Sequence, residues 1–189
     1  ITKPVYSISF SGNRSMVAGG KTLTLEPTVK AADGKKPSNS SLSWSISGDT
    51  AYVESFSGGV LKTKLVSERK YVTVTAKAKD GSGVSKNWKV TICPATTSVH
   101  ILDEFDNKVG DKTLYMRAGE TMDLGAVSYP NGSGSVAAQA WNWTSSSKTY
   151  ATVNSAGVVT AKKAGTVTIK AAAKDGTGKY DTVTIKILG

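Results

Sequence analysis

The sequence lacks most of the residues that an active site or a metal centre requires. Among 189 residues there is one cysteine, Cys93, and one histidine, His100. A single cysteine cannot form an internal disulfide, and a hydrolytic triad or zinc site would need the histidine beside a nucleophile or further ligands. No pair of carboxylates occupies repeated or cleft-forming positions, as glycoside hydrolysis would require. We therefore expect no enzymatic activity and no cofactor.

Long apolar runs and helical periodicity are also missing. No stretch is long and apolar enough to cross a membrane, and no signal peptide is recognisable, so we expect no membrane insertion. Hydrophobic residues make up 39% of the chain and charged residues 20%, a composition typical of a soluble globular protein. We expect a monomeric segment of a longer protein.

One module is present twice in the chain. Residues 79–83, Lys-Asp-Gly-Ser-Gly, return as Lys-Asp-Gly-Thr-Gly at 174–178. Three further segments of the first half recur in the same order in the second half: 43–45 as 142–144, 59–63 as 157–161, and 72–76 as 167–171. Duplication of one folding unit is typical of modular arrays. We place the domains at residues 1–93 and 94–189, with the boundary near Pro94.

The pattern within each copy predicts β-structure only. Short runs rich in Val, Ile, Thr, Trp and Tyr alternate with polar residues and are separated by Gly, Ser, Asn and Asp. The expected strands are 5–10, 21–30, 41–47, 50–54, 58–64, 70–79 and 84–92, then 98–102, 120–127, 139–145, 149–153, 157–161, 165–173 and 179–187. About seven strands per copy is typical of an immunoglobulin-like β-sandwich. The short link predicts two tandem sandwiches standing end to end.

The two-residue period of a strand predicts which side chains enter the core. Trp44 and Trp143 occupy the same central position and point inward. Two apolar stripes repeat between the copies: Val72, Val74, Ala76 and Ala78, then Val167, Ile169, Ala171 and Ala173. The Asp-Gly-Ser/Thr-Gly segments are hairpin turns. Cys93 is expected to be a half-buried thiol at a strand end that matches Lys186, and the last hairpin of the first copy to be two residues longer.

One loop breaks the symmetry between the copies. Around residues 102–111 the second copy carries about eight extra residues, among them Asp103, Glu104, Asp106 and Asp111, beside Phe105. Carboxylates of this number could form a calcium site, but their spacing does not fit the twelve-residue calcium loop. We expect the loop to pack against the first domain, with Phe105 as the apolar contact.

Charge and aromatic residues suggest possible partners. Residues 1–93 carry 14 basic and 6 acidic residues (net +8), and residues 94–189 carry 10 and 8 (net +2). The basic first domain favours anionic surfaces, whereas scattered lysines do not indicate nucleic-acid binding. Trp88 and several tyrosines are candidates for stacking on sugars, although Trp88 shares a face with Val90 and Ile92. An internal Lys–Asn isopeptide bond is disfavoured because the lysines lie on outward phases.

The ordered motifs resemble the group 2 bacterial immunoglobulin-like (Big) domain. The second copy carries them best, at 119–122, 143–145, 153–161 and 165–169, while Ser67-Glu68-Arg69-Lys70 departs from the pattern in the first. The resemblance implies an extracellular or bacterial cell-surface location. Such domains serve as stalk repeats in intimin- and invasin-like adhesins, and also accompany the catalytic domains of secreted glycan-degrading enzymes. The family has no universal catalytic or ligand residues.

We therefore expect a non-catalytic structural or adhesion module, acting as a semi-rigid spacer or protein-interaction domain. The alternative is a carbohydrate- or cell-wall-binding module accessory to a secreted glycan-degrading enzyme. The partner is then an unknown protein or glycan at the cell surface.

Overall fold

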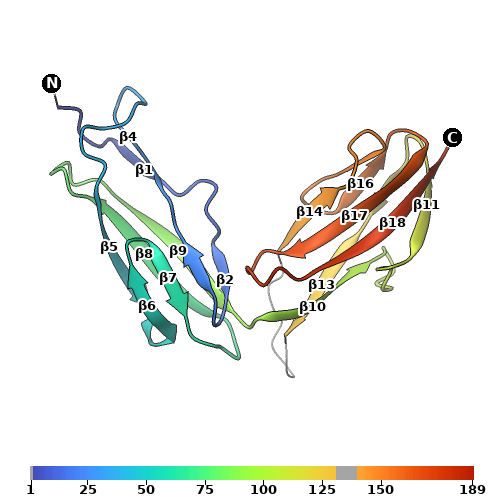
Figure 1. The fold of residues 1–189 in the computed structure, drawn as a ribbon, viewed down its shortest axis with the longest axis horizontal. Helices are drawn as coiled ribbons and strands as arrows, with labels where there is room; N and C mark the ends of the chain where they lie inside the picture. The colour runs from blue at the N-terminus through green and yellow to red at the C-terminus, as the bar shows by residue number, and fades with distance from the viewer. Residues whose placement is uncertain (1, 131–139) are drawn as a thin grey trace. The chain divides into compact units, whose positions relative to one another are not determined.

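The chain folds into two compact units, Ile1–Pro94 and Ala95–Gly189. The computed structural model describes residues 2–130 and 140–189, and Figure 1 labels most of its strands. Within those residues every regular element is a strand, apart from one 3-10 turn, η1 (Thr50–Tyr52). The predicted all-β class of two immunoglobulin-like sandwiches is confirmed.

The first unit contains a four-stranded sheet opposite shorter strands. The order of the larger sheet is β2 (Met16–Ala18), β9 (Ser85–Cys93), β8 (Lys70–Ala78), β5 (Leu42–Gly48). Opposite lie the three-stranded sheet β3 (Thr22–Thr24), β7 (Val60–Thr63), β6 (Val53–Ser57) and the pair β1 (Ser7–Ser9), β4 (Thr28–Lys30). Side chains from both layers form one core cluster, so the unit is a two-layer sandwich.

The second unit repeats this arrangement. Its four-stranded sheet has the order β11 (Thr113–Arg117), β18 (Tyr180–Leu188), β17 (Gly165–Ala173), β14 (Trp141–Ser145). Opposite lie β12 (Thr121–Asp123), β16 (Val158–Ala161), β15 (Ala151–Val153) and the pair β10 (Thr96–Leu102), β13 (Gly125–Pro130). The first position of the strand expected at 139–145 lies outside the described residues.

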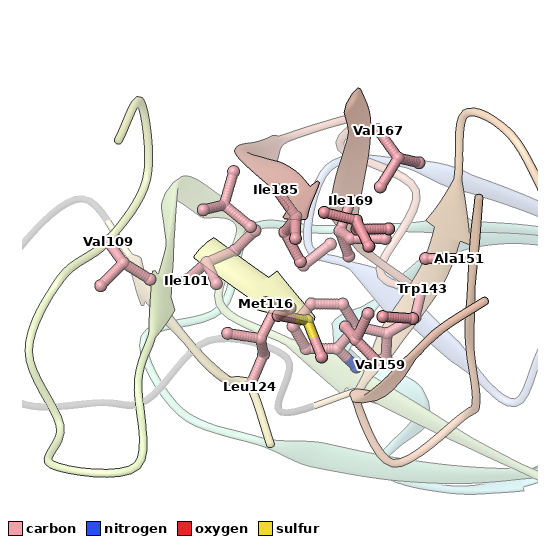
Figure 2. Packing of buried hydrophobic residues seen from close by; sticks show 14 of the residues in the cluster. Ile101, Val109, Met116, Leu124, Trp143, Ala151, Val159, Val167, Ile169 and Ile185 are labelled. Carbon is pink, nitrogen blue, oxygen red and sulfur yellow. The ribbon is translucent and has the colours of Figure 1, made fainter. Parts of the chain in front are cut away.

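The predicted inward stripes form the cores of the two sandwiches. All eight residues of the stripes on β8 and β17 are buried, and the alternate residues between them are not. Trp143 is 8% exposed, and Trp44 is half-buried against the first core. In Figure 2 the side chains of Met116, Trp143 and Val159 lie together in the middle of the second core. The two-residue period therefore predicted the packing correctly.

Two short strands were missed by the sequence patterns. β2 runs parallel to β9, and β11 runs parallel to β18, so each pairs with the last strand of its unit. The single strands expected at 21–30 and 120–127 are each divided in two, because the chain crosses from one sheet to another there. Both β2 and β11 are short and lack a hairpin partner, so the sequence carries no local signal for either strand.

The expected match of Cys93 with Lys186 is wrong. Val72 pairs with Val90 and Val167 with Ile185, so the last strands align without a length difference and Cys93 corresponds to Leu188. The last hairpin of the first unit is therefore not two residues longer. Cys93 is fully buried, and its thiol lies 3.5 Å from the Val17 carbonyl oxygen.

The repeated Gly-Val pair has a packing role in both sandwiches. Gly157 has a φ of 94°, and a Cβ there would approach carbons of the Trp143 ring to 3.1 Å and collide with the Leu124 carbonyl oxygen. Gly59 has a φ of 83°, and a Cβ there would approach Trp44 to 3.0 Å. Only glycine combines this backbone conformation with so close an approach to the central tryptophan.

A departure of the first copy from the family pattern has a local compensation. In the second unit Gly165 packs closely against the Tyr150 ring. The first unit has Lys70 at the corresponding place, and its ammonium lies 4.7 Å from the centre of the Tyr52 ring. A cation over the face of a tyrosine is attracted by the ring quadrupole. The substitution thus exchanges a close backbone contact for a cation–π contact.

Candidate interaction site

The loop between β10 and β11 is organised by its own polar groups. One Asp103 oxygen accepts hydrogen bonds from the backbone N–H groups of Phe105 and Asn107, each at 2.9 Å, and the Asn107 side-chain amide contacts both oxygens. These hydrogen bonds, with that from the Asn107 backbone the largest cause, lower the pKa of Asp103. The Val109 side chain is buried and fixes the far end of the loop.

The four acidic residues of this loop do not converge. Asp106 and Asp111 have positive φ angles of 62° and 59°, and the Asp111 N–H donates to the Thr182 carbonyl. Within residues 2–130 and 140–189, no group of three or more His, Cys, Asp or Glu side chains is placed to hold a metal ion. The Asp103 oxygens already accept hydrogen bonds from Phe105 and Asn107, so they are poorly placed to act as calcium ligands.

A hollow lies beside this loop on the second unit. It has a volume of about 380 Å³. Its lining consists of Asp103, Glu104, Phe105, Leu114, Thr121, Met122 and Asp123. The Phe105 side chain is 76% exposed, and its expected contact with the first unit stays a prediction. Sequence reasoning missed Leu114, Met122 and Asp123 because they come from β11 and β12, which the chain brings beside the loop only on folding.

Trp88 belongs mainly to the first core. Its ring stacks on Phe10 with centroids 5.5 Å apart, and its Nε1–H donates to the Arg14 carbonyl oxygen at 3.1 Å. The ring is half-buried, as its strand phase indicates. The better exposed aromatic side chains on the four-stranded sheets are Tyr71, Tyr115 and Tyr180, which are 45%, 62% and 56% exposed.

The repeated hairpin aspartate does more than form a turn. In the first unit an Asp80 oxygen accepts the Val5 backbone N–H at 2.5 Å, and the other accepts from Ser82. In the second, Asp175 accepts the Thr96 N–H at 3.0 Å and two hydrogen bonds from Thr177. Each aspartate thereby ties the beginning of its unit to the far hairpin. We call these two carboxylates the hairpin pins.

Both hairpin pins are held in the ionised form. Burial opposes the charge on Asp175, but hydrogen bonds from Thr177 and Thr96 outweigh it and lower its pKa. The pKa of Asp80 is lowered by hydrogen bonds from Ser82 and Val5. Asp175 is fully buried, whereas Asp80 is half-buried. The carboxylate is therefore a structural anion in each sandwich.

His100 has no partner that would make it a catalytic base in the described structure. It lies on β10, half-buried, with its ring centroid 5.8 Å from that of Tyr129.

No helix in the described ranges is long and apolar enough to span a bilayer.

Two β-sandwiches with these features define an immunoglobulin-like modular protein. Residues 106–183 match the model of the bacterial Ig-like domain (group 2) family. The match lies wholly within the second unit, and it confirms the resemblance seen in that unit's motifs. No curated protein sequence matches the chain significantly.

Several solved structures resemble the chain in fold. A C-terminal fragment of intimin, solved in complex with the intimin-binding domain of the translocated intimin receptor, shares 22% identity with a TM-score of 0.35; the match covers 97% of this chain and 64% of the fragment. Domains 4 and 5 of the S-layer protein SbsC share 17% identity with a TM-score of 0.35, over 98% of this chain and 99% of theirs. Mouse cadherin-23 EC22-24 shares 13%, with a TM-score of 0.35, over 96% and 67%. At such low identities and TM-scores these likenesses support no functional conclusion.

Proposed function

We propose that the chain is a non-catalytic structural or adhesion module of a bacterial surface or secreted protein, and that each unit keeps its fold when pulled between its ends. The first unit is proposed to be a divergent member of the same domain family. The carrying observation is the parallel pairing of a strand near the start of each unit with the last strand. β11 pairs with β18 and β2 with β9.

The parallel pair determines how force acts on the second unit. Five residue pairs join β11 to β18, from Thr113–Thr184 to Arg117–Leu188. Force reaches β18 from its carboxyl end and β11 from its amino end. Neighbouring parallel strands pulled from opposite ends must slide past one another, so their evenly spaced hydrogen bonds bear the force together. Sequential opening from one end would need much less force.

The hairpin pins support the same geometry. The Val5 N–H in the first unit and the Thr96 N–H in the second are held by a carboxylate on the hairpin that precedes the last strand. Hydrogen bonds to an ionised acceptor are roughly twice as strong as neutral ones. In both units, therefore, the hairpin pin holds the first segment of the sandwich, and the parallel pair holds its last strand.

A non-catalytic role is supported by what the two units have in common. The shared residues form cores, turns and pins, whereas His100 and the acidic loop occur in the second unit alone. None of these shared residues forms a reaction site in the described parts of the two units. The semi-rigid spacer is therefore the function that the repeated geometry favours, and a protein contact at the hollow beside Phe105 is compatible with it.

Single-molecule pulling through the two termini tests this function. The expected record has two separate unfolding events, because each unit has its own core. Each event should lengthen the chain by roughly 300 Å, from about 95 residues at about 3.4 Å per residue. A gradual extension without resolved force peaks would contradict the proposed mechanical role.

A further inference from the structure

The outer faces of the two four-stranded sheets share one composition. On the second unit the outward positions of β11, β18, β17 and β14 carry six threonines: Thr113, Thr144, Thr166, Thr168, Thr182 and Thr184. Arg117, Lys170, Lys186, Tyr115 and Tyr180 share this face. Within these described strands, no outward position of the face holds a carboxylate. We call this surface the second hydroxyl face.

The first unit has a matching surface, the first hydroxyl face. Its hydroxyl residues on β5, β8 and β9 are Ser43, Ser45, Ser47, Thr73, Thr75, Ser85 and Thr91. Lys77, Lys89 and Tyr71 lie among them, and the described outward positions again include no Asp or Glu. The residues differ between the units at most positions, yet the same chemistry is kept: hydroxyls, cations and a tyrosine.

The cations of the hydroxyl faces are not neutralised by carboxylates. Lys170 Nζ lies 3.8 Å from the centre of the Tyr180 ring, and Lys89 Nζ lies 4.7 Å from that of Tyr71. Ion pairs of the described structure, such as Lys62–Glu54, lie off these faces. A tyrosine ring positions an ammonium group without removing its charge. The lysines therefore remain available to an external anion.

The acidic residues of the second unit are directed elsewhere. Asp181 follows Tyr180 on β18 but has the inward phase, and it accepts the Ile101 N–H at 2.7 Å. Asp103, Glu104 and Asp123 line the hollow beside the β10–β11 loop. These four acidic side chains thus lie away from the sheet face that carries Arg117, Lys170 and Lys186.

We propose that the hydroxyl faces bind an extended anionic polysaccharide. Carboxylate or phosphate groups of the glycan pair with lysine, and sugar hydroxyls exchange hydrogen bonds with Ser and Thr side chains, which donate and accept. The exposed Tyr115 and Tyr71 offer rings for stacking. A sheet places such groups on an extended surface with strands about 4.8 Å apart, which suits a chain of sugars.

An acidic peptide fits these faces less well. It would satisfy the lysines, but it brings few groups that pair with rows of neutral hydroxyls. Glycan binding goes beyond the mechanical role and does not depend on it. A sandwich that resists pulling and fails to bind a glycan would overturn only the present proposal.

Binding of the full chain to immobilised polygalacturonate, at about 0.15 M salt to screen weak surface attraction, tests the proposal. Neutral dextran and polyglutamate are the comparison polymers. The test variant carries K77Q, K89Q, K170Q and K186Q on the faces. The matched control carries K35Q, K36Q, K162Q and K163Q, which remove the same charge from exposed residues off the face positions. Thermal melts confirm that both variants are folded.

We expect the chain to bind polygalacturonate more tightly than polyglutamate and not to bind dextran. The face variant should lose about tenfold in affinity, as expected when charge-assisted contacts are removed, and the control less than about twofold. Three results would each overturn the proposal. They are absence of binding to polygalacturonate, equal losses in the two variants, and equal affinity for polyglutamate.

Discussion

Substitution of Asp175 by asparagine tests the hairpin pin of the second unit. The two carboxylate oxygens serve different donors: Oδ2 accepts from the Thr96 N–H, and Oδ1 accepts from the Thr177 N–H and hydroxyl. An asparagine has one acceptor oxygen, so its NH₂ group must face one of these donors. At least one donor then loses its partner, and the Thr96 side is almost completely buried.

The cost follows from these contacts. A hydrogen bond to a charged group contributes about 1.5–3 kcal/mol, and an unsatisfied buried donor costs about 1–3 kcal/mol. The Thr177 side is only partly buried, so a donor that loses its partner there can bond to water, and the total stays below the sum of the two costs. We therefore expect Asp175→Asn to reduce the free energy of unfolding of the second unit by about 3 kcal/mol. In a domain of this size, that corresponds to a melting temperature lower by roughly 12–24 °C.

Differential scanning calorimetry of the full chain measures this change. The transition of the second unit should shift, while that of the first unit should stay in place because the units have separate cores. Asp80→Asn is the matched variant in the first unit, where a half-buried carboxylate should give a smaller shift. A change of less than about 0.5 kcal/mol for Asp175→Asn, typical of an ordinary surface substitution, would refute the role of the pin.

Three further outcomes follow from the structure. The pKa of Asp175 is lowered in the folded state, so its stabilising effect is complete above the unfolded pKa of about 3.9 and is lost as pH falls through the folded pKa. The difference in unfolding free energy between wild type and Asp175→Asn, measured by urea titration, should therefore narrow below about pH 4. A difference that stays constant with pH would contradict this. Gly157→Ala should cost about 3 kcal/mol, from a positive φ, a collision with the Leu124 carbonyl oxygen and a close approach to the Trp143 ring. Gly178→Ala, with a φ of 75° and open space around it, should cost only about 1 kcal/mol in the same denaturation assay, and equal costs would show that the crowding at Gly157 is unimportant. Calcium at about 1 mM should leave the melting temperature of the second unit unchanged, because the carboxylates of residues 103–111 do not converge. This concentration lies in the affinity range of weak extracellular calcium sites. A clear rise in melting temperature would contradict that arrangement.

The sequence predicted the sandwich cores because alternation is a local property of a strand. The stripe from Val72 to Ala78 needs only a two-residue period, and its repeat from Val167 to Ala173 identifies the same face in the second copy. The outward phase of Lys77 and the partial burial of Trp88 follow from the same rule. Each of these predictions depends on a few neighbouring residues.

The features that the sequence did not predict depend on contacts between distant segments. The sequence indicates only a turn at Asp80 and Asp175, because the N–H groups that donate to these carboxylates lie 75 and 79 residues earlier in the chain. β2 and β11 pair with strands at the far end of their units and have no adjacent hairpin. Alignment of the two copies by motif matches Cys93 with Lys186 rather than Leu188, because it ignores the pairing of strands. The lining of the hollow was missed for the same reason.

The most direct test of the mechanical claim compares two pulling directions in the second unit. Handles at Lys112→Cys and Leu188→Cys stretch β11 and β18 from opposite ends, whereas handles at Lys112→Cys and Lys179→Cys open the pair from the end where both strands begin. The native Cys93 is fully buried, so the engineered thiols react first. We expect a clearly higher unfolding force in the first direction, because the hydrogen bonds between β11 and β18 then bear the force together. Equal forces in the two directions would show that the parallel pair has no mechanical role.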